Sequence, residues 1–218
     1  MYRCEFARMV DISAVRAQST KAEVDMIIDA AKKYGFVCVF GLNGFTPYIV
    51  RRLEDRPDIA VGGVVGFPSG GESTAAKCFQ ADEMQKCGCG EIDMVMNVGR
   101  LKSGMFADVR ADIAAVRKAV EKPLKVIVEA PLLDEAELAA AARIVLESGA
   151  DFVKTGTGWA GATTLRHVEV IKNAVGDGIK IKVAGGVRDV ETVESMRALG
   201  VSRFGIGYSS ALKIIESL

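Results

Sequence analysis

The chain has 218 residues, of which 50% are hydrophobic and 26% charged, and its 28 basic side chains balance its 28 acidic ones. A chain of this length buries roughly 70% of its unfolded surface without disulfides or structural metals, so we expect one domain over residues 1–218. The zero net charge provides no long-range field for a nucleic-acid backbone or an anionic membrane, and the single histidine excludes a multi-histidine metal centre.

The N-terminal segment and the cysteines predict a cytoplasmic protein. The segment MYRCEFARMVD carries four charged side chains where an export signal needs an apolar core. The five cysteines are odd in number and form no C-x-x-C pair, so they fit neither a disulfide framework nor a zinc ribbon. The longest uncharged run, Tyr34–Val50, is broken by glycine and proline and is short of the roughly 20 residues that cross a bilayer. We expect reduced thiols, no metal and no membrane partner.

Short β-branched runs alternate with longer amphipathic segments along the whole chain, which predicts a parallel sheet with a helix after each strand. The predicted strands, in chain order, are Met9–Ser13, Phe36–Leu42, Ile59–Gly66, Glu91–Val98, Leu124–Ala130, Asp151–Thr155, Ile179–Ala184 and Ser202–Gly207. Capping residues mark several of the helices between them. The predicted helix starts are Ser19 or Thr20, Asp134 and Asp189, and the predicted ends are Gly35, Gly149 and Gly200.

Eight strand–helix units of about 27 residues each predict an α/β fold, a small (β/α)₈ TIM barrel, for which about 250 residues is typical. Pro47 and the charged stretch RRLEDRPD leave the helix after the second strand only about two turns. A doubly wound open sheet is the alternative. That fold usually carries a glycine-rich nucleotide loop after its first strand, and its absence here favours the barrel.

Three ionisable residues lie inside otherwise apolar strands, near the strand ends where a barrel places its active site: Asp93, Lys154 and Lys182. A salt bridge or an extended, partly solvated side chain would explain either lysine alone. Two lysines at matching positions of neighbouring strands would lower each other's pKa and yield a neutral amine, which is a nucleophile toward carbonyl groups. Asp93 could then carry protons to and from the Schiff-base intermediates.

Glycine-rich segments follow the predicted seventh and eighth strands, where barrels often bind phosphate. Tight turns would explain the glycines equally well, but backbone N–H groups and a helix N-terminus can converge on an anion there. The candidate phosphate-binding residues are Gly185, Gly186, Arg188, Gly207, Ser209 and Ser210. Two other residues are expected near the site. Trp159 either covers the pocket or packs as an ordinary aromatic residue, and Glu129 is a candidate partner for a lysine.

Five segments stand in the order and spacing of one known family: VGFPSGGEST, GEIDMVMNVGRLKSG, LKVIVEAPLL, GADFVKTGTGW and IKVAGGVRD. From about Val61 to Ser210 the chain resembles the class I deoxyribose-phosphate aldolases. The resemblance implies a homodimeric barrel that reversibly cleaves 2-deoxyribose 5-phosphate to acetaldehyde and glyceraldehyde 3-phosphate without metal or organic cofactor. It implies that Lys154 forms the Schiff base, that Lys182 perturbs it and that Asp93 relays protons. It also places the substrate phosphate at Gly185, Gly186, Arg188, Ser209 and Ser210.

The chain departs from the family pattern in substrate-facing segments. The family's usual Asp-His-Thr-Leu-Leu run is Asp11-Ile12-Ser13-Ala14-Val15 here, and Phe40-Gly41-Leu42-Asn43 replaces its Cys followed by Asn-Pro. The loop after Lys154 is about two residues shorter. These changes leave two alternatives open: a Schiff-base aldolase for another carbonyl pair, and a non-catalytic phosphosugar-binding barrel. The presence of both lysines and Asp93 argues against the second alternative.

Overall fold

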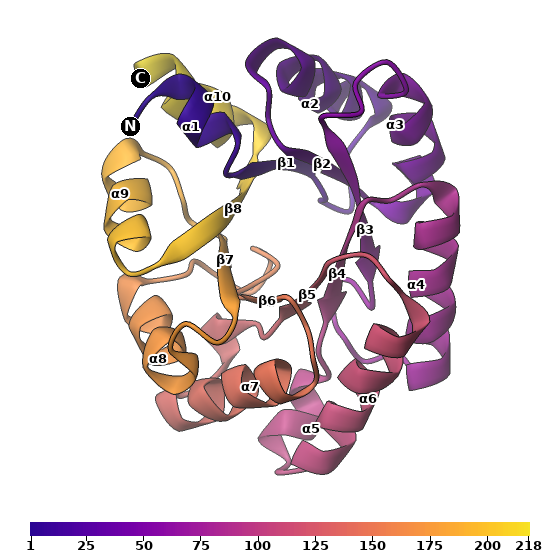
Figure 1. The fold of residues 1–218 in the computed structure, drawn as a ribbon, viewed down its shortest axis with the longest axis vertical. Coiled ribbons are helices and arrows are strands. Elements are labelled where there is room, and N and C mark those ends of the chain that lie inside the picture. The colour runs from indigo at the N-terminus through magenta and orange to yellow at the C-terminus, as the bar shows by residue number, and fades with distance from the viewer.

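The computed structural model describes residues 1–218. Its eight parallel strands pair in chain order, and β8 pairs with β1 to close a barrel that the helices surround (Figure 1). The predicted (β/α)₈ barrel is therefore confirmed, and the open-sheet alternative is wrong. The strands are β1 (Val10–Ala14), β2 (Cys38–Gly41), β3 (Ala60–Val65), β4 (Glu91–Val95), β5 (Leu124–Ile127), β6 (Phe152–Lys154), β7 (Lys180–Ala184) and β8 (Val201–Gly207).

The outer layer contains the helices that follow each strand, together with one short helix before β1 that the sequence did not indicate. The helices are α1 (Arg3–Ala7), α2 (Lys21–Tyr34), α3 (Thr46–Arg52), α4 (Thr74–Cys87), α5 (Val98–Lys102), α6 (Phe106–Ala119), α7 (Glu135–Glu147), α8 (Leu165–Val175), α9 (Val190–Ala198) and α10 (Tyr208–Ser217). Two 3₁₀ turns, η1 (Asn43–Phe45) and η2 (Ala130–Leu132), precede α3 and α7. None of the helices combines the length and apolar character that crossing a membrane requires.

Local sequence signals account for most helix starts. Thr20, rather than Ser19, caps α2 by accepting a hydrogen bond from the Glu23 N–H. Asp134 caps α7 in a reciprocal capping box, and Asp189 caps α9. The predicted short helix is α3, with seven residues. The glycines predicted at the helix ends, Gly35, Gly149 and Gly200, all have positive φ.

Two strands, β4 and β5, end three residues earlier than the apolar runs that predicted them. The run after β4 was expected to stay extended to Val98, but Asn97 caps α5 by accepting from the Arg100 N–H. The run after β5 was expected to reach Ala130, but Glu129 adopts a left-handed conformation with φ of 56° and begins η2. Both segments remain buried after the strand ends, so their hydrophobicity does not mark the end of the strand.

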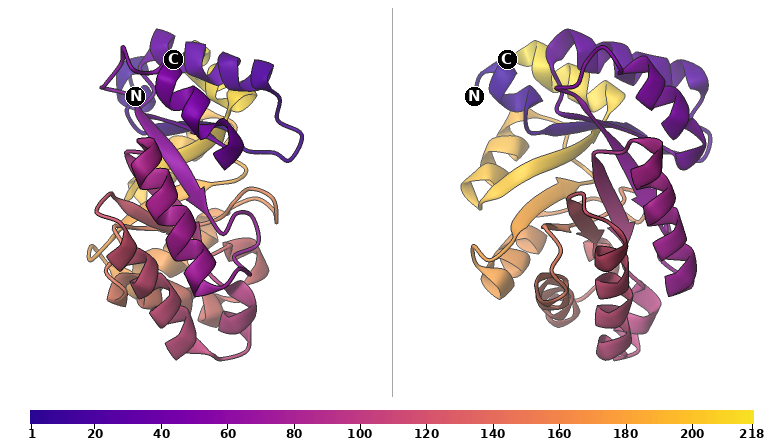
Figure 2. Two further views of the ribbon diagram at one scale, coloured as in Figure 1. Left: turned by 90° about the vertical axis from the view of Figure 1, so that its right-hand side faces the viewer. Right: turned by 45° about the vertical axis from the view of Figure 1, so that its right-hand side comes forward.

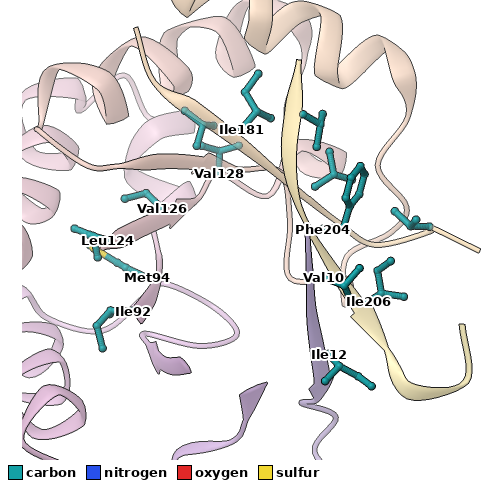
Figure 3. Close-up of a cluster of buried hydrophobic side chains, with 14 of the residues drawn as sticks. Val10, Ile12, Ile92, Met94, Leu124, Val126, Val128, Ile181, Phe204 and Ile206 are labelled. Atoms are coloured by element: carbon teal, nitrogen blue, oxygen red, sulfur yellow. The ribbon is translucent and has the colours of Figure 1, made fainter. Parts of the chain in front are cut away.

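The main hydrophobic core lies between the barrel and the helices. Val10, Ile12, Ile92 and Met94 are among the outward-facing strand residues of this layer (Figure 3). Because successive side chains of a strand point to opposite faces, the residues between them face the barrel interior. Several of these interior residues are charged, so the middle of the barrel is the polar part of the molecule.

The parallel register sets which interior residues are neighbours. Lys154 on β6 pairs with Lys182 on β7, and Asp93 on β4 pairs with Lys125 on β5. The loops after β1 and β6 extend from the same side of the barrel (Figure 2). The site described next is therefore assembled from residues that are far apart in sequence and adjacent in the barrel wall.

Candidate active site

Asp93 connects the two lysines that the sequence singled out. Lys154 Nζ donates to Asp93 Oδ2 at 2.7 Å, and Lys182 Nζ donates to the same oxygen at 2.5 Å. Lys154 is 7% exposed, whereas Lys182 is 1% exposed and Asp93 is fully buried. The structure thus brings the three predicted catalytic residues together, with Lys154 the most accessible of them.

Burial lowers the pKa of the Lys154 amine to about 8, because a charged ammonium is costly to keep away from water. The nearby Lys182 and Lys125 ammonium groups also contribute to this lowered pKa, while the Asp93 carboxylate opposes them. A substantial fraction of Lys154 is consequently neutral near physiological pH. A neutral amine is the form that attacks a carbonyl carbon.

Lys125 is a third interior lysine, which was not among the site residues predicted from the sequence. It is fully buried on β5 and donates to Asp93 Oδ1 at 3.1 Å and to Glu91 Oε2 at 2.5 Å. Burial would raise the pKa of Asp93, but Lys125, Lys154 and Lys182 outweigh it and hold that pKa well below its usual range. Asp93 is therefore an anion that accepts hydrogen bonds from three amines.

Two more charged groups complete the cluster, and one of them, Asp11, also lines the cavity described below. Asp11 on β1 lies 2.6 Å from Lys182 Nζ and accepts from Arg203 at 2.6 Å. Arg203 on β8 also donates to Glu91 at 2.9 Å. For Asp11, burial again favours the neutral form, but Lys182, Lys125 and Arg203 outweigh it and lower the pKa. The interior thus holds a nearly balanced ionic network.

Asp11, Cys38 and Glu91 place oxygen or sulfur atoms within 4.8 Å of one another, which is close enough for shared metal ligation. The two carboxylates are already paired with Lys125, Lys182 and Arg203. Burial also raises the pKa of the Cys38 thiol well above its usual value, which opposes the thiolate form that binds metals. The donor set is therefore poorly suited to a cation.

A cavity of about 610 Å³ opens above Lys154 at the C-terminal ends of the strands. Lys154 and Lys182 both line it. Loops after β1, β3, β6, β7 and β8 form much of the remaining wall, together with strand residues such as Asp11 and Phe40. All of the predicted phosphate-binding residues line this cavity: Gly185, Gly186, Arg188, Gly207, Ser209 and Ser210.

The glycines after β7 are explained first by packing. Gly185 and Gly186 have φ of 92° and 85°, a region that other residues rarely adopt. A Cβ atom on Gly185 would lie 2.8 Å from the Gly161 carbonyl oxygen, and one on Gly186 would lie 2.6 Å from Ala162 Cβ. The two glycines therefore allow the β7 loop to lie against the loop after β6.

The start of α10 offers unpaired donors to the same cavity. Its N-cap is Gly207, which has no side chain to accept a bond from the first turn. The first N–H groups of a helix have no partner within the helix and carry a partial positive charge. Tyr208, Ser209 and Ser210 form this first turn and line the cavity. An anion at this point would find free backbone donors.

Trp159 and Glu129 hold the loop after β6. Trp159 lines the cavity, packs edge-on against Phe67 with 5.9 Å between ring centres, and donates through Nε1 to the Val15 carbonyl oxygen at 3.2 Å. Glu129 was expected to pair with a lysine, and this expectation is wrong. Its carboxylate instead accepts from the backbone N–H and the hydroxyl of Thr157, at 3.0 and 2.6 Å.

Comparison with known proteins agrees with this geometry. Residues 8–215 match the family model described as DeoC/LacD family aldolase. The chain belongs to this family of aldolases. It is 44% identical over 214 residues to a deoxyribose-phosphate aldolase of Rhizobium meliloti (strain 1021), covering 97% of this chain and 86% of the relative. It is 40% identical over 216 residues to deoxyribose-phosphate aldolase 1 of Staphylococcus aureus (strain MRSA252), covering 98% and 97% of the two chains.

Solved structures of aldolases resemble the whole barrel. One, described as "QR15, an Aldolase", superposes with a TM-score of 0.90 at 32% identity and covers 97% of this chain and 95% of its own. A tetrameric deoxyribose phosphate aldolase from Aeropyrum pernix superposes with a TM-score of 0.89 at 26% identity and covers 99% and 91%. Membership of the family therefore extends over essentially the entire chain.

Proposed function

We propose that this DeoC/LacD family member is a class I aldolase, a lyase that reversibly cleaves 2-deoxy-D-ribose 5-phosphate into acetaldehyde and D-glyceraldehyde 3-phosphate. The observation that carries the proposal is the Lys154 amine, whose pKa burial lowers to about 8, at the base of a cavity and 2.7 Å from the Asp93 carboxylate. The names of its relatives support the choice of substrate.

The reaction begins when the neutral Lys154 amine adds to C1 of the open-chain sugar and forms a carbinolamine. Protonation of the carbinolamine hydroxyl group releases water and leaves an iminium ion. Asp93, which is within hydrogen-bond distance of Lys154 and Lys182, can pass protons between the lysines and this intermediate. The covalent intermediate thus forms with groups that the chain itself supplies.

The iminium ion then accepts the electron pair of the C2–C3 bond as that bond breaks. The C3 hydroxyl group loses its proton, C3 becomes the carbonyl carbon of glyceraldehyde 3-phosphate, and the two remaining carbons stay on Lys154 as an enamine. Protonation of the enamine at C2 and hydrolysis of the resulting iminium ion release acetaldehyde and restore the amine. The reverse sequence forms the same bond.

The substrate phosphate is proposed to lie at the loops after β7 and β8. The support is the unpaired first turn of α10 and the exposed Arg188 guanidinium, which makes no hydrogen bond within the chain. Backbone N–H groups and a nearby arginine are common phosphate donors. Gly185, Gly186, Gly207, Ser209 and Ser210 would line this subsite.

Reductive trapping tests the proposal directly. Incubation with acetaldehyde and borohydride is expected to add two carbons to Lys154, as mapped by peptide mass spectrometry. Lys154→Ala is expected to lose at least about a thousandfold in cleavage rate, because it removes the most accessible amine of the cavity, the one that carries the covalent intermediate. Full activity of this variant, or a wild-type chain without an adduct, would reject the mechanism.

A second candidate keeps the mechanism and changes the carbonyl pair. It is favoured by the apolar part of the cavity, which Phe40, Val64 and Phe67 line. A panel of aldehyde, ketone and keto-acid donors decides between the two. A clear preference for deoxyribose 5-phosphate in kcat/KM would reject the second candidate.

A homodimer and a cytoplasmic location remain proposals. The five cysteines are all unpaired, which is typical of proteins in reducing compartments. The Aeropyrum pernix relative is described as tetrameric, so a larger assembly is the alternative to a dimer. Light scattering of the purified chain is expected to give about 46 kDa, twice the monomer mass of 23.2 kDa. A mass of 23 or 93 kDa would contradict the dimer.

A further inference from the structure

Phe40 lies in the middle of the charged interior. It is on β2, only 3% exposed, and lines the cavity. The centre of its ring is 4.4 Å from Lys182 Nζ, 5.2 Å from Lys125 Nζ and 5.8 Å from Lys154 Nζ. An aromatic face attracts ammonium groups within about 6 Å. One apolar side chain is thus in contact range of all three interior lysines.

Gly62 fixes the position of this ring. It pairs with Phe40 across the β2–β3 ladder, and a Cβ atom on Gly62 would lie 2.1 Å from Phe40 Cζ. The ring therefore occupies space that any other residue at position 62 would fill. Because Gly62 is in a strand with ordinary backbone angles, close packing of the ring is the reason that glycine is required here.

The three lysines differ in how far they reach the cavity. Lys154 is 7% exposed, Lys182 is 1% exposed and Lys125 is fully buried. The ring centre lies nearest to Lys182 and farthest from Lys154. Of the two lysines that line the cavity, Lys182 is thus nearer to the Phe40 ring and less exposed, and Lys154 is farther from it and more exposed.

We propose that Phe40 is a positioning residue that restricts access from the cavity to Lys182, at its edge, and to Lys125, so that Lys154 is the amine a carbonyl substrate reaches. This inference rests on the proposed Schiff-base function. Lys154 and Lys182 share the Asp93 oxygen and are otherwise alike in chemistry. Without the ring, a ring-sized space beside Lys182 would admit water and small aldehydes.

Admission of water would also change the titration of Lys154. Water solvates an ammonium and so removes the burial that favours the neutral amine. The groups that face this cluster are Asp11 on β1, Cys38 on β2, Glu91 and Asp93 on β4, Lys125 on β5, Lys182 on β7 and Arg203 on β8. All are unchanged by a substitution at position 40. The pH midpoint for trapping of Lys154 is therefore expected to rise.

The experiment maps adducts after treatment with acetaldehyde and borohydride. Phe40→Ala is expected to acquire an adduct on Lys182 besides Lys154, and its pH midpoint for trapping is expected to rise by about one unit. Phe40→Leu keeps an apolar side chain of similar size and is expected to be labelled on Lys154 alone. Val64→Ala is the matched control, because Val64 is buried at the same cavity wall. It is also expected to be labelled on Lys154 alone.

The outcomes separate this inference from the proposed function. A folded Phe40→Ala chain labelled only on Lys154, with an unchanged pH midpoint, would overturn the role of Phe40. A wild-type chain without any adduct would instead overturn the Schiff-base function. If Phe40→Ala fails to fold, as judged by thermal unfolding, Gly62→Ala displaces the ring while keeping residue 40. Labelling of Lys182 in Gly62→Ala would support the shielding role, and labelling of Lys154 alone would overturn it.

Discussion

At the scale of single residues, the chemistry depends on a difference in pKa among three lysines that lie close together. All three approach the Asp93 carboxylate, yet burial and neighbouring cations lower the pKa of Lys154 while surrounding carboxylates raise that of Lys125. The difference arises from position: Lys125 has Glu91 as a second carboxylate partner, whereas Lys154 has only Asp93. A reactive amine is thus obtained without a histidine.

Lys182→Met is expected to raise the pKa of Lys154. The substitution removes one nearby ammonium and leaves Asp93 with one fewer cation, and both changes favour protonated Lys154. The rising limb of the kcat/KM profile should therefore move from near pH 8 to higher pH by about one unit or more. An unchanged limb in Lys182→Met would show that Lys182 does not act through the Lys154 amine. Lys180→Met, an exposed lysine on the same strand, is the control and is expected to keep the wild-type profile.

At the scale of elements, α4 and α6 are joined by a buried ion pair outside the active site. Lys77 Nζ donates to Asp112 Oδ2 at 2.7 Å, and the Thr74 hydroxyl donates to Asp112 Oδ1 at the same distance. The side chains of Lys77 and Asp112 are 0% and 2% exposed. The Lys77 side chain also packs next to Gly66, where a Cβ atom would lie 3.1 Å from Lys77 Cε. Gly66 begins the loop after β3 that carries Phe67. The ion pair thus packs against the loop whose Phe67 lines the cavity.

Lys77→Met is expected to lower the free energy of unfolding by about 3–5 kcal/mol, because it leaves Asp112 buried without its cation. The double variant Lys77→Met, Asp112→Leu should lose much less than the two single changes added together. Urea denaturation with each variant measures this coupling. The exposed Lys86–Asp82 pair on the same helix provides the comparison, and Lys86→Met should change stability little. An equal loss of unfolding free energy in Lys77→Met and Lys86→Met would contradict the difference expected between a buried and an exposed ion pair.

The sequence predicted the elements well where local signals determine them. Asp134 and Thr20 cap their helices, and all eight strands are present, because capping chemistry and β-branched runs act over a few residues. The strand ends after β4 and β5 were missed, since the apolar character continues into buried turns. Lys125 and Glu91 were also missed, although both lie at inward positions of their strands. Glu91 and Asp93, two residues apart on one strand, are the signal that could have revealed a charged interior.

The network as a whole could not be read from the sequence. The partners of Asp93 come from β5, β6 and β7, and only the register of the closed barrel makes them neighbours. Phe40 likewise looked like a departure in a substrate-facing strand, and its contact with three ammonium groups depends on the space at Gly62. Long-range pairing of this kind has no counterpart in local patterns.

At the scale of the whole molecule, the lowered pKa of Lys154 links catalysis to folding. The amine titrates near 8 in the folded chain and near 10.5 when exposed, so between these values the unfolded chain binds one more proton. Folding stability therefore rises with pH across this window, by about 3 kcal/mol in total at about 1.4 kcal/mol per pH unit. Below pH 8 Lys154 adds no pH dependence, because both states hold the proton and the cost of burying the charged amine is constant.

Comparison of the wild type with Lys154→Met measures this linkage, since every other titrating group is shared. The wild type is expected to gain stability relative to Lys154→Met as the pH rises from 8 to 10.5, measured by urea denaturation at each pH. A constant difference between the two chains over this range would contradict a lowered Lys154 pKa.

The separation of the apolar layer from the charged interior has an evolutionary consequence. Val10, Ile12, Ile92 and Met94 hold the strands to the helices from outside the barrel, while the residues that meet substrate point the other way. Heritable changes to the inward set can therefore accumulate without weakening the shell that keeps the chain folded. Descendants of one barrel can diverge in the carbonyl compounds they process while their architecture is inherited unaltered.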